Sequence, residues 1–62
     1  MDSNEQFKTL QVAISHGGGF IQKLAEAALH ADPANKALIF KTWPVLEMTY
    51  GPNSALYLNW NK

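Results

Sequence analysis

The stretch HGGGFIQKLAEAALHADP, residues 16–33, contains the strongest helical signal in this chain. In its middle, apolar residues recur at intervals of three and four, which is the spacing of one face of an α-helix. These residues are Ile21, Leu24, Ala25, Ala28 and Leu29. Alanine has the best helix propensity of all residues, and residues 20–31 contain four alanines. The stretch therefore predicts a helix over residues 20–31.

The next helix is expected to begin at the Asp32-Pro33 pair, because aspartate is a preferred N-cap and proline suits the first helical position. It should run over residues 33–42 and end before the Trp-Pro pair that follows, since a residue before proline is pushed out of the helical region. The apolar run LIF, residues 38–40, makes this helix apolar around more than half of its circumference. Such a helix usually has neighbours on two sides.

On the N-terminal side, Ser3 and Gln6 fit a capping box with Ser3 as the N-cap, which predicts a helix over residues 4–15. Apolar residues at positions 10, 12 and 14 alternate with other residues there. Because alternation of this kind is typical of a half-buried strand, a strand over residues 8–15 remains the alternative.

On the C-terminal side, a further helix is predicted over residues 44–50, with Gly51 as a left-handed C-cap. Apolar residues at positions 56, 58 and 60 then alternate with others, which predicts an extended or short-strand tail over residues 53–62. We therefore expect a single all-α domain, a small bundle of three to four short helices with that tail.

The composition excludes several classes of protein. The absence of cysteine rules out a disulfide framework and thiolate zinc sites. Five lysines balance five acidic residues and there is no arginine, so nucleic-acid binding is not expected. No run approaches the length of a membrane span, and the polar start MDSNEQF is unlike a signal peptide. We therefore expect a cytoplasmic protein with no membrane association.

The chain has more apolar residues than so small a core can enclose. Of its 62 residues 47% are hydrophobic, whereas a domain of this size buries only about 60% of the surface of its unfolded chain. This excess predicts a homo-oligomer, most simply a two-fold dimer. Aromatic side chains are enriched in interfaces, so they are the predicted partner-binding or oligomer-interface residues. They are Phe40, Trp43, Tyr57 and Trp60.

The glycine run, Gly17, Gly18 and Gly19, interrupts the helical pattern. Each glycine inside a helix costs about 1 kcal/mol relative to alanine, so we favour a turn with at least one positive φ angle. The spacing of apolar residues from Phe7 to Ala28 continues through the run, and a kinked continuous helix remains an alternative. A third interpretation is an anion-binding site, because backbone N–H groups at the start of a helix bind phosphate.

No catalytic or metal-binding set is apparent. Ser15 adjoins His16, but nothing in the sequence places a carboxylate to orient the imidazole, so we expect no enzyme and no cofactor. Glu26 and His30 are four residues apart and could pair on a metal with His16 or Asp32. Because a metal site needs three or four converging ligands, no metal site is predicted.

Residues 16–52 carry a pattern of short motifs. They are HGG at 16–18, FI at 20–21, LAEA at 24–27, ADPAN at 31–35, WP at 43–44 and YG at 50–51. The pattern resembles a group of short reading frames common in phage and prophage genomes, from which the tail after Pro52 departs. The resemblance implies a phage or mobile-element origin, where very small accessory proteins often act by binding a host protein. It carries no functional residues over to this chain.

We therefore expect a non-enzymatic protein-interaction module that associates with itself and binds a host or phage protein. Its best-motivated form is a phage-encoded accessory protein that inhibits a host defence protein. The alternative is a small-ligand binder that captures a phosphate or nucleotide at Gly17–Gly19. A nucleic-acid accessory protein is a weaker third possibility, because the chain has no arginine.

Overall fold

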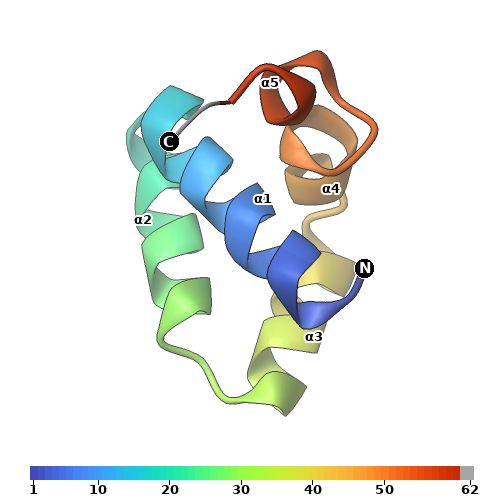
Figure 1. Ribbon diagram of the computed structural model, residues 1–62. Helices are drawn as coiled ribbons and strands as arrows, with labels where there is room; N and C mark the ends of the chain where they lie inside the picture. Colours follow the sequence, from blue (N-terminus) through green and yellow to red (C-terminus); the bar gives the residue numbers. More distant parts are fainter. Residues whose placement is uncertain (61–62) are drawn as a thin grey trace.

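The computed structural model describes residues 1–60, which contain five helices and no strand (Figure 1). The helices are α1 (Ser3–His16), α2 (Gly19–Leu29), α3 (Pro33–Thr42), α4 (Val45–Tyr50) and α5 (Ala55–Leu58). The predicted all-α bundle is confirmed, and the strand alternative for residues 8–15 is wrong. Residues 30 and 31, which we expected in the second helix, lie in the turn before α3. No helix within residues 1–60 has the length and apolar character needed to cross a membrane.

The cap of α1 lies one residue earlier than predicted. Asp2, not Ser3, is the N-cap, and its Oδ1 accepts a hydrogen bond of 2.8 Å from the backbone N–H of Glu5. The Glu5 carboxylate in turn accepts a bond of 3.2 Å from the backbone N–H of Asp2. Two overlapping capping boxes are present in the sequence, Asp2/Glu5 and Ser3/Gln6. The pair with two carboxylates forms, because charged acceptors make the stronger bonds at a helix N-terminus.

α1 is the central helix of the fold, with α2 packed along one side of it and α4 and α5 along another (Figure 1). Its inward face is therefore wide, and its buried residues all lie within positions 9–13. The fully buried residues of the three core helices are Thr9, Leu10, Val12, Ala13, Ala25, Ala28 and Leu46. Phe7, which we expected on the apolar face, is 57% exposed. The inward face is centred on residues 9–13, so Phe7 falls outside it.

The chain reverses direction at Gly17 and Gly18, both of which have extended backbone angles. None of the glycines, all of which lie within the described residues, has a positive φ, so that part of the turn prediction is wrong. Gly17 is needed for space instead. A Cβ atom there would lie 2.6 Å from the Ala13 carbonyl oxygen and 2.8 Å from Cβ of Ile21. The absence of a side chain lets the start of α2 lie against the end of α1, and the two are separate helices.

The C-terminal part differs most from the prediction. Gly51 ends α4 with a φ of −83°, not in the left-handed region, and its N–H donates to the Glu47 carbonyl at 2.9 Å. Residues 55–58 then form α5 in place of an extended tail, with Ser54 Oγ accepting from the Tyr57 N–H at 3.2 Å. A strand needs a partner strand, and residues 1–60 contain none, whereas a serine cap stabilises a helical turn locally. The last two residues of the predicted tail, 61–62, lie outside the described residues.

Candidate interaction surface

The predicted interface residues of α3 pack partly inward. Trp43, the C-cap of α3, is half-buried, and its ring meets that of Phe20 edge to face, with 6.1 Å between the centroids. Phe40 is also half-buried and packs against the core. These contacts attach α3 to the rest of the fold, so Phe40 and Trp43 contribute to its packing. Phe20 is 63% exposed and was not among the predicted site residues.

The predicted interface residues near α5 are likewise partly covered. The ring of Tyr57 lies below the Lys8 ammonium group, which is 4.3 Å from the ring centroid. This cation–π contact joins α5 to α1. Trp60 is half-buried against the core. The four predicted aromatic residues therefore do not form one exposed patch.

Large apolar side chains are exposed elsewhere, and several of them lie close together in the sequence. Leu38 on α3 is 57% exposed, and Val45 and Met48 on α4 are 40% and 77% exposed. A lysine and a glutamate, both exposed, lie on the same two helices. We call this set the α3–α4 surface, defined as Leu38, Lys41, Val45, Glu47 and Met48.

The arrangement of α3 explains why this surface is open. Its inner side carries the half-buried residues Ile39, Phe40 and Trp43, whereas no residue of the helix is fully buried. α2 is its principal neighbour among the described helices. The outer side presents residues at the spacing of one helical stripe. They are Ala34, Ala37, Leu38 and Lys41, all exposed.

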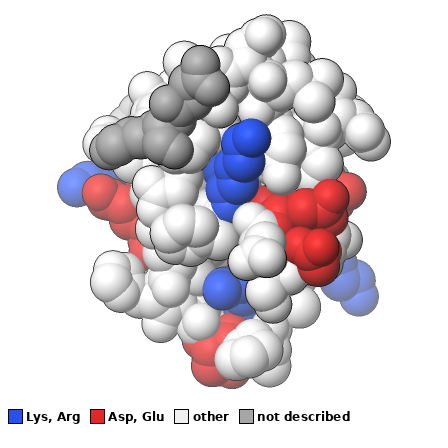
Figure 2. Space-filling view, in the orientation of Figure 1, with Lys and Arg blue, Asp and Glu red and all other residues white. Residues whose placement is uncertain are grey.

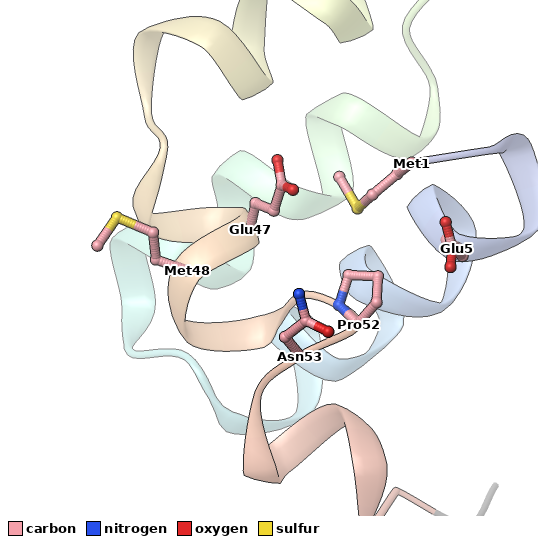
Figure 3. A pocket seen from close by; sticks show the side chains of 6 residues that line it. All are labelled: Met1, Glu5, Glu47, Met48, Pro52 and Asn53. Carbon is pink, nitrogen blue, oxygen red and sulfur yellow. The ribbon is translucent and has the colours of Figure 1, made fainter.

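A hollow of about 440 Å³ adjoins the α4 part of this surface (Figure 3). Its lining combines thioethers, carboxylates, an amide and a proline ring. The residues are Met1, Glu5, Glu47, Met48, Pro52 and Asn53. In Figure 3, Glu47 and Met1 lie on one side of the hollow and Pro52 and Asn53 on the other. The hollow thus brings α1, α4 and the turn before α5 together, and none of its lining residues was predicted as a site from the sequence.

Charged side chains of both signs are interspersed over the face of the molecule drawn in Figure 2. Among the described residues one ion pair forms, between Lys23 and Glu26 at 3.7 Å, and both side chains are well exposed. Neither Lys41 nor Glu47 is within ion-pair distance of another described residue. Both are therefore available to charges on a second molecule.

Asp32 is the N-cap residue of α3, but its side chain does not cap the helix as predicted. The carboxylate accepts a hydrogen bond of 2.6 Å from Nδ2 of Asn35, which reaches back from the first turn of α3. The Asn35 amide therefore takes the place of a backbone N–H. This hydrogen bond holds the pKa of the Asp32 carboxyl below its ordinary value of 3.8.

Among the described residues, the fold brings no hydrogen-bonding side chain to the glycine run and no further metal ligand to the Glu26 and His30 pair. Gly18 is the N-cap of α2 and leaves open space around it, but no side-chain hydrogen bond or ion pair within residues 1–60 reaches Gly17, Gly18 or Gly19. Within the same residues no three metal-ligating side chains come together, so Glu26 and His30 acquire no third ligand.

Comparison of the chain with protein families, curated proteins and solved structures found no match. The functional argument therefore rests on the exposed residues themselves.

Proposed function

We propose that this chain is a non-enzymatic protein-interaction module whose contact surface is the α3–α4 surface. The observation that supports this proposal is the exposure of Leu38, Val45 and Met48 on two consecutive helices, α3 and α4. Large contiguous patches of exposed apolar side chains on soluble proteins mark sites where another molecule binds.

The folded state of the chain argues against a purely intramolecular role for these side chains. Its accessible surface is 4037 Å², and a compact monomer of 6.9 kDa is expected to have about 4000 Å². The chain is thus already as compact as its mass allows. Leu38 and Met48 stay exposed in this compact fold and are therefore accessible to a second molecule.

The proposed role follows from the resemblance of residues 16–52 to phage and prophage reading frames. We propose that the assembled protein is a phage-encoded accessory protein that binds and inhibits a host protein, with a defence protein as the leading class of target. Capture of a phosphate or nucleotide at Gly17–Gly19 is not proposed, because no side-chain hydrogen bond or ion pair among the described residues reaches these glycines.

Affinity capture from bacterial host lysates with surface variants tests the proposal. The test variant carries Leu38→Asp and Met48→Asp, and the matched control carries Leu58→Asp, since Leu58 on α5 is 69% exposed and lies outside the surface. We expect the wild type and the control to retain the same host protein and the double variant to lose it. Equal retention by all three proteins, or no retained protein at all, would contradict the proposal.

A further inference from the structure

We propose that the α3–α4 surface is covered by a second copy of this chain, in a two-fold dimer in which Lys41 of each copy faces Glu47 of the other. This inference rests on the proposed function, because it names the partner of the same surface. In a two-fold contact the same patch is used by both copies, so a patch that fits itself must carry complementary features.

The apolar part of the surface suits the centre of such a contact. Leu38, Val45 and Met48 are all exposed and lie on α3 and α4, which only two residues separate. Ala34 and Ala37 flank Leu38 on the outer stripe of α3 and add no bulk. A second helix can therefore approach α3 closely and bury Leu38.

The charges favour a second copy over a strongly charged partner. α3 contains lysines and no acidic residue, whereas Glu47 lies on α4, so the surface carries both signs at separate positions. A two-fold axis through the apolar centre would bring Lys41 to Glu47 twice. The chain has a formal net charge of zero, so two copies do not repel each other over longer distances.

The hollow beside Glu47 gives the incoming lysine a place to bind (Figure 3). Its volume of about 440 Å³ is ample for a lysine side chain. The thioethers of Met1 and Met48 can cover the aliphatic part of the lysine, and the Glu47 and Glu5 carboxylates can receive its ammonium group.

The size of the two helices can be compared with the area that a stable dimer buries. A standard interface buries about 800 Å² on each partner, which is about a fifth of the 4037 Å² of this chain. α3 has 10 residues and α4 has 6, which together make up about a quarter of the chain. A contact of standard size would therefore have to use most of the outward-facing side chains of both helices.

Charge reversal with mixing tests the pairing directly. Lys41→Glu and Glu47→Lys are prepared as separate proteins, and their masses are measured by sedimentation up to hundreds of micromolar. Each variant alone is expected to remain near 6.9 kDa, because like charges then meet at both contacts. An equimolar mixture is expected to restore the doubled mass, because every contact in the mixed dimer again joins opposite charges. Lys23→Glu, which reverses a charge on α2, serves as the control and should dimerise like the wild type.

Several results would overturn the dimer: a wild type that stays at 6.9 kDa, single variants that dimerise like the wild type, or a mixture that stays monomeric. If a charge variant does not fold, as judged by its melting curve, Leu38→Glu replaces it and is expected to abolish the dimer. A monomeric wild type whose capture of a host protein still depends on Leu38 and Met48 would overturn the dimer and leave the proposed function standing. If the wild type is monomeric and also captures no host protein, both the dimer and the proposed function are overturned.

Discussion

The rings of Phe20 and Trp43 meet edge to face, with 6.1 Å between their centroids and 63° between their planes. The contact joins the first turn of α2 to the C-cap of α3. α3 has no fully buried residue, and it packs against the core through Ile39, Phe40 and Trp43. The Phe20–Trp43 contact therefore helps to fix the orientation of the α3–α4 surface, although Phe20 is largely exposed.

We expect the two rings to stabilise the fold cooperatively. Phe20→Ala, Trp43→Ala and the double variant form a double-mutant cycle, and aromatic pairs of this geometry contribute about 0.5–1.5 kcal/mol beyond their buried area. Urea denaturation of the four proteins measures the coupling. Leu58→Ala paired with Phe20→Ala is the control and should be additive, since Leu58 lies on α5. Additive effects of Phe20→Ala and Trp43→Ala would show that the contact between the two rings does not stabilise the fold.

The three adjacent glycines should respond differently to alanine. Gly17→Ala is expected to lower the free energy of unfolding by more than about 1 kcal/mol, because its Cβ would collide with Ile21 and with the Ala13 carbonyl. Gly18→Ala and Gly19→Ala meet no atoms within 4 Å and should be neutral or stabilising by less than about 1 kcal/mol. Thermal melts followed by circular dichroism separate the outcomes. The account of this turn would be wrong if all three variants melted alike.

The capping box of α1 can be located by two single substitutions. Asp2→Ala removes the acceptor of the Glu5 N–H and should destabilise the protein by about 1 kcal/mol. Ser3→Ala changes a side chain that makes no capping bond and should have little effect. Urea denaturation of both variants under the same conditions gives their free energies of unfolding for comparison. A larger loss of stability in Ser3→Ala than in Asp2→Ala would show that Ser3 is the N-cap, as the sequence first indicated.

The Asp32–Asn35 hydrogen bond predicts a dependence of stability on pH. It lowers the pKa of Asp32 in the folded protein below its ordinary value of 3.8, so the fold favours the charged carboxylate. The resulting stabilisation is present above pH 3.8 and is lost as the pH falls through the lower, folded pKa. We expect Asn35→Ala to raise the pKa of Asp32, as measured by NMR titration of its carboxyl carbon. An unchanged pKa in Asn35→Ala would remove this hydrogen bond as the cause.

The helices with strong local signals were the most predictable from sequence. The bounds of α3, residues 33–42, follow from Asp-Pro before it and Trp-Pro after it, because both pairs restrict the backbone locally. α5 was missed because alternation of Leu56 and Leu58 resembles a strand, and only the fold reveals that no partner strand is present within residues 1–60. A turn at Gly17–Gly19 was anticipated, but not which glycine is needed, because the contact between position 17 and Ile21 depends on how α2 turns back.

The candidate surface could be predicted only in part. The apolar run at residues 38–40 indicated two neighbours for α3, but which side would stay open depends on where α2 packs. Trp43 stands out in the sequence as an anchor, yet its ring is partly covered by Phe20. Met48 carries no sequence signal of its own, and its exposure of 77% becomes informative only beside Val45 and Leu38.

If the α3–α4 surface holds two copies of this chain together, the mass of the wild-type protein in solution must depend on its concentration. Sedimentation equilibrium over a range of concentrations should show a mass that rises from 6.9 kDa towards twice that value, while Leu38→Glu stays at 6.9 kDa. A wild type that remains at 6.9 kDa at every concentration, up to hundreds of micromolar, would contradict the claim.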